Sequence, residues 1–288
     1  MSRRLFDAME EVGERVVRAP HLLLCFDFDG TLAPIAEEPA LVCLSPHMRR
    51  VVLSLADHDG VSLAVISGRD RADLQTRVGI PGLIYAGNHG LEISGPGCVF
   101  VEPAAAARSA ALKELAVDLA DKLYPVAGAW VEYKGLTLSI HYRQVADADC
   151  AEVRRQVQAA LASTEQLFQL TRGDKTYDIR PRVGWNKGTA IDWIREQLGL
   201  PDTLAIYLGD DTTDENAFRA LPEGITVKVG GPSATAARYR LENPAEVRRF
   251  LEWVEGLLRQ KTECAAEIVA PGADEREIST LLGIVQAS

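Results

Sequence analysis

The chain has 288 residues, 47% of them hydrophobic and 25% charged, and its formal net charge is −10. This length is comfortable for two domains, and the composition is that of a globular protein whose core needs neither disulfides nor a structural metal. The negative charge argues against a nucleic-acid partner, because contacts with a phosphate backbone need a basic surface.

The cysteines and the first residues bear on the cellular compartment. The five cysteines are scattered and never occur in a CxxC spacing, so we expect reduced thiols in a cytoplasmic protein. Residues 1–20 mix charged and apolar side chains and lack the apolar centre of a signal peptide. No run of about 18 apolar residues occurs, so we expect neither a membrane-spanning helix nor a membrane partner. The sequence leaves the oligomeric state open.

Strands and helices alternate over the first part of the chain. Short, continuously apolar runs are typical of strands buried on both faces, and helical patterns fill the segments between them. Such alternation predicts a parallel sheet with helices on both faces. The expected elements are a helix over 3–18, strands over 22–26, 62–66 and 83–86, and helices over 46–58 and 70–78.

The pattern changes in the middle of the chain, where helices alternate with hairpins. Hairpin turns are expected at 134–135 and 173–174. We therefore predict a doubly wound α/β core made of residues 1–103 and 183–288, with an α+β cap domain inserted at 104–182. The cap would contain helices over 107–123 and 149–163 and strands over 129–134, 136–143, 166–172 and 175–180. The second part of the core would contain a helix over 187–198, strands over 204–208 and 225–229, a helix over 244–260 and a short last helix near 274–285.

Two carboxylates follow the first buried strand. Residues 26–32 read FDFDGTL, which puts Asp27 and Asp29 at the carboxyl end of that strand, where open parallel sheets bind ligands. The turn at Gly30 can bring both toward one site, and two adjacent carboxylates either raise a pKa or recruit a cation. One can then act as a nucleophile while the other, protonated, acts as an acid.

Three further motifs lie at strand ends or helix starts. Ser67, in VISGR at 65–69, can form an anion cradle with backbone N–H groups, although alone it is typical of a helix N-cap. Lys187 begins a helix in WNKG at 185–188, and its ammonium group can bridge a phosphate and a carboxylate. Residues 208–215 read LGDDTTDE, and acidic residues clustered at a strand end are costly unless a hard cation such as Mg²⁺ neutralises them. An acidic helix start is the alternative for Asp214 and Glu215, but it does not easily explain Asp210 and Asp211.

These four motifs, in this order, resemble those of the haloacid dehalogenase superfamily of phosphotransferases. The resemblance implies that Asp27 is the nucleophile, and that Asp29 is first the acid for the leaving oxygen and then the base for water. Ser67 and Lys187 would hold the phosphoryl oxygens. The implied Mg²⁺ ligands are Asp27, the backbone carbonyl of Asp29, and Asp210, with Asp211 or Asp214 acting through water or on the other ligands.

One face of the small predicted sheet is polar. Strand alternation puts Leu138 and Ile140 on one face, and Ser139 and His141 on the other. If the two inserted helices cover the apolar face, the polar face looks toward the nucleophile and can hydrogen-bond the hydroxyl groups of a sugar. An ordinary solvated sheet face is the alternative. The residues that carry the sugar hypothesis are Glu132, Lys134, His141, Arg143 and Arg180.

Several segments are similar to the trehalose-6-phosphate phosphatase family. They are AGNHGLE at 86–92, VEYK at 131–134, IHYR at 140–143, YDIRP at 177–181 and GDDTTDE at 209–215. The similarity extends from about residue 22 to about residue 257. It implies a phosphoric monoester hydrolase that makes trehalose from trehalose 6-phosphate, the last step of trehalose biosynthesis. Family members often carry Glu where Asp178 stands in this chain.

The prediction of the substrate depends on the cap. The substrate-binding residues predicted on these grounds are Arg69, Asn88, His89, Glu132, Lys134, Arg143 and Arg180. For His89, a helix-cap or core role is the alternative. The same catalytic core would serve a phosphatase of sucrose, mannosylglycerate or glucosylglycerol phosphate, or a sugar-phosphate mutase. A binding module without catalysis is disfavoured, because the nucleophile and the metal ligands are intact.

Overall fold

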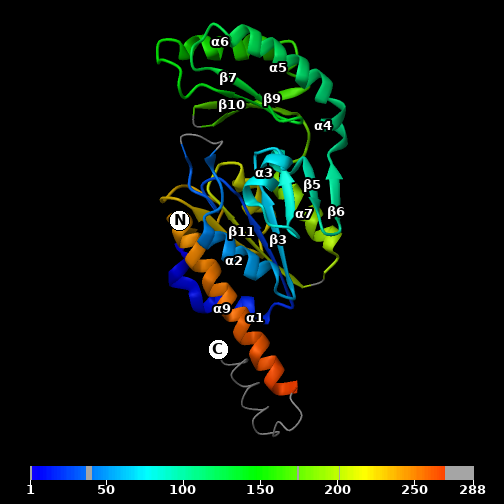
Figure 1. The fold of residues 1–288 in the computed structure, drawn as a ribbon, viewed down its shortest axis with the longest axis vertical. Coiled ribbons are helices and arrows are strands. Elements are labelled where there is room, and N and C mark those ends of the chain that lie inside the picture. The colour runs from blue at the N-terminus through cyan, green and yellow to red at the C-terminus, as the bar shows by residue number, and fades with distance from the viewer. Residues whose placement is uncertain (1, 37–40, 174, 201, 270–288) are drawn as a thin grey trace.

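In the computed structural model the described residues are 2–36, 41–173, 175–200 and 202–269, with side chains described up to residue 263. They form two sheets, one of nine strands and one of four (Figure 1). The predicted fold class, a doubly wound and mainly parallel sheet with an additional α+β unit, is confirmed. Within these residues, no helix combines the length and the apolarity needed to cross a bilayer.

The nine-stranded sheet has the order β1-β13-β12-β11-β2-β3-β4-β5-β6, and neighbouring strands pair in parallel except β4 with β5 and β5 with β6. The strands are β1 (Arg3–Arg4), β2 (His21–Phe26), β3 (Val61–Ile66), β4 (Ile84–Gly87), β5 (Glu92–Gly95), β6 (Cys98–Val101), β11 (Thr203–Gly209), β12 (Ile225–Val229) and β13 (Tyr239–Leu241). The two central strands, β2 and β11, are paired over six residues, from Thr203 opposite His21 to Leu208 opposite Phe26.

After His21, strand β2 is apolar because both of its faces are covered. Leu22, Leu24 and Phe26 belong to one hydrophobic core, and Leu23 and Cys25 belong to another. Helices α1 (Met9–Arg18), α2 (Pro46–Ala56), α3 (Arg71–Val78) and α9 (Pro244–Val269) contribute to the first core. Helices α7 (Lys187–Leu198) and α8 (Asp214–Ala220) contribute to the second. The continuous apolar run thus reports burial between two helical layers.

The four-stranded sheet is antiparallel, with the order β7-β8-β10-β9. Its strands are β7 (Trp130–Tyr133), β8 (Leu138–His141), β9 (Phe168–Gly173) and β10 (Thr176–Pro181). Helices α5 (Ser109–Leu123) and α6 (Cys150–Leu161) cover its outer face and share a third hydrophobic core with it (Figure 1). The short helix α4 (Pro103–Ala107) leads into this unit. The limits 104 and 182 for a cap domain stay a prediction.

Several short elements of the core were not predicted from the sequence. The helix predicted over 3–18 begins only at Met9, because Arg3 and Arg4 pair with β13 and a 3-10 turn, η1 (Leu5–Ala8), follows them. Strands β5 and β6, strand β13 and helix α8 were not predicted. Each is short; β13 is held by pairing with β1 and β12, and β5 and β6 pair with each other at the edge of the sheet. The expected turn residue Asp174 and the expected helix near 274–285 lie outside the described residues.

Candidate active site

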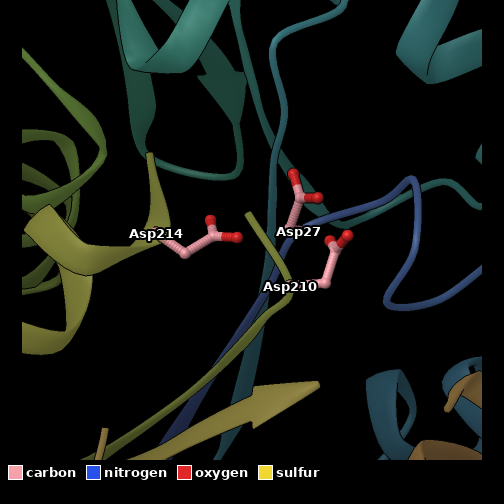
Figure 2. Close-up of side chains that lie close together, drawn as sticks. All are labelled: Asp27, Asp210 and Asp214. Carbon is pink, nitrogen blue, oxygen red and sulfur yellow. The ribbon is translucent and has the colours of Figure 1, made fainter. Parts of the chain in front are cut away.

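The carboxylates of Asp27 and Asp210 lie side by side because their strands are neighbours. Asp27 follows β2 and Asp210 follows β11, and the Asp27 N–H donates to the Leu208 carbonyl at 2.9 Å. Figure 2 shows Asp214, at the start of α8, directing its carboxylate toward the other two. Oxygen atoms of all three lie within 4.8 Å of one another. The carboxyl end of the sheet therefore gathers three acids at one point.

The chain can approach Asp210 because residue 30 is glycine. Gly30 has φ +78°, and a side chain there would overlap the Asp210 carboxylate. The Thr31 hydroxyl donates to Asp210 Oδ1 at 3.2 Å. The turn after β2 thus needs glycine twice over, for its backbone angle and for its contact with the acid.

Lys187 lies at the centre of the acidic group. Its Nζ donates to Asp27 Oδ1 at 2.7 Å and to Asp214 Oδ1 at 2.6 Å, and its side chain is only 2% exposed. Asn186 caps the start of α7 by accepting from two backbone N–H groups, which fixes the first residue of the helix. A helix start thus delivers a cation to the end of a strand far away in sequence.

One cation does not neutralise three carboxylates. Burial raises the pKa of Asp27 well above its usual value; the Lys187 charge opposes this shift, and Asp214 and Asp210 add to it. Burial and the Asp214 charge raise the pKa of Asp210 to about 6. Like charges crowded in a buried site are relieved by a proton or by a metal ion. The set of oxygen donors fits a hard divalent cation such as Mg²⁺.

The predicted acids Asp29 and Asp211 lie differently from these three. The Asp29 carboxylate accepts two hydrogen bonds from the Arg69 guanidinium, each 2.7 Å long. Asp211 is exposed, and its Oδ1 accepts from the Thr212 N–H at 2.6 Å. It is Asp214, and not Asp211, that belongs to the carboxylate group.

A cavity of about 390 Å³ opens beside Asp27 and is lined by both sheets. From the core it is lined by Asp27, Asp29, Ser67, Arg69, His89, Lys187, Asp210 and Asp211, and from the small sheet by Trp130, Glu132, Lys134, Ser139, His141, Arg143 and Asp178. The polar face of the small sheet therefore faces Asp27. The volume of the cavity is in the range of sites that bind small molecules.

The polar face is held in place by contacts among its own side chains. His141 Nε2 lies 2.8 Å from Glu132 Oε2, and Lys134 Nζ lies 3.6 Å from the same oxygen. Burial favours a raised pKa for Glu132, but the His141 hydrogen bond and the Lys134 charge outweigh it, so the pKa is lowered. The Trp130 ring stacks on His141 with centroids 3.9 Å apart. Glu132 is thus an ionised acceptor beside an aromatic surface.

Trp130 is a lining residue that the sequence analysis did not single out as a site residue. It shares a strand face with Glu132 and Lys134, and this alternation was the signal that could have identified it. It is 49% exposed despite its size. Aromatic rings at the mouth of a polar cavity offer a flat apolar surface for a ligand.

Asn88 and Arg180 do not line the cavity beside Asp27. The Asn88 amide donates to Glu92 Oε1 at 2.7 Å and to the Lys134 carbonyl at 2.9 Å, so it joins the core to the small sheet. Arg180 lines a second cavity, and His89 lines both. The backbone N–H of His89 donates to the Ser67 carbonyl at 2.8 Å, which ties the wall between the cavities to the end of β3.

Comparison with known proteins gives one consistent family. A sequence model described as trehalose-phosphatase matches residues 25–245. A trehalose-phosphate phosphatase of Mycobacterium tuberculosis is 38% identical over 271 residues, covering 89% of this chain and 67% of that protein. The one from Mycobacterium marinum is 37% identical over 256 residues, covering 85% of this chain and 64% of the other.

Solved structures share the fold. The C-terminal domain of trehalose-6-phosphate phosphatase from C. albicans has a TM-score of 0.74 at 22% identity, covering 89% of this chain and 98% of the other. A trehalose-6-phosphate phosphatase from Aspergillus fumigatus has a TM-score of 0.62 at 27% identity, covering 89% and 99%. The family match spans β2 to α9, and with it all the acidic residues around Lys187. The chain is therefore a member of the trehalose-phosphatase family of phosphate-ester hydrolases.

Proposed function

We propose that this chain hydrolyses trehalose 6-phosphate to trehalose and phosphate through an aspartyl-phosphate on Asp27. The observation that carries the proposal is the ion pair of Asp27 with Lys187 on the floor of a cavity whose other wall is the polar face of the small sheet. The relatives named as trehalose-phosphate phosphatases support the choice of substrate. The phosphate ester would enter with its phosphoryl group toward Asp27 and its sugar toward Glu132 and Lys134.

In the first step a carboxylate oxygen of Asp27 attacks phosphorus, and the bond from phosphorus to the sugar oxygen breaks. Lys187 occupies Oδ1 of Asp27, which leaves Oδ2 for the attack. Asp29 gives a proton to the departing sugar oxygen. In the second step Asp29 takes a proton from water, whose oxygen attacks phosphorus and frees Asp27. Two easier steps replace one difficult displacement.

Asp29 must release Arg69 to carry the proton it donates. A protonated carboxyl group carries no charge and is a weak acceptor at its hydroxyl oxygen, whereas Arg69 donates to both oxygens of Asp29. The phosphoryl group of an incoming substrate competes for the guanidinium, because planar donor pairs bind phosphate as well as carboxylate. Arg69 would therefore pass from Asp29 to the substrate, which leaves the acid ready to act only when substrate is present.

Asp27, Asp210 and the backbone carbonyl of Asp29 would hold Mg²⁺ in this proposal, with Asp214 next to them. The ion would neutralise charge on the phosphoryl oxygens. Lys187 orients Asp27 and adds a second positive charge at the same place. Ser67, at the end of β3, would donate its hydroxyl to a phosphoryl oxygen.

The substrate is tested by measuring phosphate release with Mg²⁺ from a panel of sugar phosphates. The panel contains trehalose 6-phosphate, sucrose 6-phosphate, mannosylglycerate phosphate and glucose 6-phosphate. We expect a strong preference in kcat/KM for trehalose 6-phosphate. An equal or higher value for another member would overturn the choice of sugar and leave the role of Asp27 standing.

Replacing Glu132 by Ala should impair hydrolysis of trehalose 6-phosphate far more than hydrolysis of a small aryl phosphate. Loss of one charged hydrogen-bond acceptor costs about 1.5–3 kcal/mol, or roughly 10- to 150-fold in kcat/KM for the sugar substrate. Glu114→Ala is the matched control, since Glu114 is an exposed acid on the outer helix α5. Equal losses on both substrates would remove Glu132 from sugar recognition.

Mg²⁺ should raise the melting temperature of EDTA-treated protein, and more at pH 7.5 than at pH 5. The raised pKa of Asp210, about 6, means that the folded metal-free protein holds this proton more tightly than the unfolded chain does. The carboxyl group therefore favours the folded state at low pH, and this contribution is lost as pH rises toward and past 6. Above that pH the Asp210 carboxylate is ionised, so Mg²⁺ can bind to it without competing with a proton.

At 100 times its dissociation constant, the ion should add about 2.7 kcal/mol to the stability of the folded state. Thermal unfolding with and without Mg²⁺ at the two pH values measures the effect. Asp210→Asn should abolish most of the Mg²⁺ response. The same response at both pH values, or in that variant, would contradict a metal site at Asp210.

A further inference from the structure

A second cavity, of about 370 Å³, lies on the other side of His89. Both units line it, with Gln169 and Arg180 from the small sheet and Thr212 and Asn216 from the core. In a chain with a net charge of −10, none of its described lining residues is acidic. The cavity therefore has the polarity of a site for a hydrophilic, negatively charged ligand.

Arg180 supplies the positive charge of this cavity. Its Nε is buried without a hydrogen-bond partner, and none of the described residues accepts a hydrogen bond from its guanidinium. The carboxylates of Asp178 and Asp211 act on it electrostatically, but neither forms an ion pair with it among the described contacts. A buried guanidinium is normally paired, so an Arg that lines a cavity without a partner marks a place for an anion.

The wall between the two cavities is an uncharged imidazole. Burial, followed by the charges of Arg180, Lys187 and Lys134, holds the pKa of His89 well below its usual value. The ring packs against Gly68, where a Cβ atom would come within 2.8 Å of it. His89 has φ +61°, a left-handed angle that its bond to the Ser67 carbonyl helps to maintain. A neutral ring thus separates the acidic site around Lys187 from the cationic cavity around Arg180.

We infer that the second cavity binds inorganic phosphate on Arg180 while the substrate occupies the cavity beside Asp27. The inference rests on the proposed function only in that the reaction releases this anion. A tetrahedral oxyanion can accept from the Arg180 guanidinium on one side and from the Asn216 amide on the other. Bound there, phosphate would join the small sheet to the core and act as an inhibitor that does not compete with the substrate.

Calorimetric titration on the Asp27→Asn protein tests this site apart from turnover. The protein is first titrated to saturation with trehalose 6-phosphate, and inorganic phosphate is then added. We expect one phosphate to bind to the saturated complex. When Arg180→Gln is combined with Asp27→Asn, the dissociation constant of phosphate should rise by roughly tenfold or more, since a charged donor is lost.

Two further variants separate the site from a general effect of charge. Gln169→Glu puts a carboxylate on the lining at an exposed position of the edge strand β9, where folding is undisturbed, and it should also weaken phosphate binding. Arg172→Gln, at another exposed position of β9, removes the same charge as Arg180→Gln outside both cavities and should leave binding unchanged.

The proposed substrate and the proposed phosphate site are tested by different steps of the experiment. If trehalose 6-phosphate does not bind in the first titration, the proposed substrate is wrong, and phosphate is then titrated into the free protein with the same set of variants. If phosphate binding is absent, or is the same in the Arg180 and Gln169 variants as in their parent, the second site does not exist. Equal weakening in Arg172→Gln would likewise overturn it.

Discussion

Replacing Asp27 by Asn should lower the rate of phosphate release by a factor on the order of 10⁴ or more, because loss of a nucleophile removes the covalent route entirely. The amide has the shape of the carboxylate and can still accept from Lys187, but it is a poor nucleophile for phosphorus. Single-turnover assays with Mg²⁺ measure the loss. Substantial turnover in the variant would refute the role assigned to Asp27.

The variant should remain folded, which makes its inactivity informative. Asp27→Asn removes one of three crowded carboxylates, and its own pKa in the native protein is raised because burial and its acidic neighbours disfavour the charge. Without Mg²⁺, the free energy of unfolding of the variant should therefore equal or exceed that of the native protein at neutral pH. Asp118→Asn, at the outer helix α5, is the control for a change of surface charge.

Replacing Lys187 by Met should reduce the free energy of unfolding by about 3–5 kcal/mol in the absence of metal and abolish activity as well. Lys187 is 2% exposed and pairs with Asp27 and Asp214, which are themselves buried, so its removal leaves two carboxylates without their cation. Urea unfolding in EDTA measures the loss. Similar stability in the native protein and the variant would contradict this view of the ion pairs.

A double-mutant cycle separates the charge effect from lost packing. In the background of Asp214→Asn, one of the stranded charges is already absent, so Lys187→Met should cost less than it does in the native protein. The difference between the two costs is the coupling between Lys187 and Asp214, whose atoms are 2.6 Å apart. Additive effects would mean that Lys187 is not coupled energetically to Asp214.

The position of Asp27 and the strand that precedes it could be predicted because their signals are local. An apolar run of strand length followed by FDFDGTL fixes both the burial of β2 and the place of Asp27 at its end. The polar face of the small sheet followed from alternation, which needs only that its helices cover the other face. Short elements such as β1 and β13 exist through pairing with each other and, for β13, with β12, and a local pattern does not contain that information.

The sequence did not predict how side chains from distant segments are placed relative to one another. The spacing in GDDTTDE does not decide which acid turns inward; α8 begins at Asp214 and buries its carboxylate, while Asp211 stays exposed. Alternation put Arg180 on the polar face correctly, but it lines the cavity on the far side of His89. Asn88 follows a strand end like Ser67, yet its amide is taken up by Glu92 and the Lys134 carbonyl.

The three hydrophobic cores have a consequence for how such a protein can change over time. Asp27 is positioned by the two cores that sandwich β2, whereas the polar face opposite is positioned by a third core shared by α5, α6 and the small sheet. Substitutions that repack the third core can reshape the polar face while the packing beneath Asp27 is untouched. Reaction chemistry and preference for a sugar can therefore be inherited separately, so one lineage can acquire new substrates without passing through inactive ancestors.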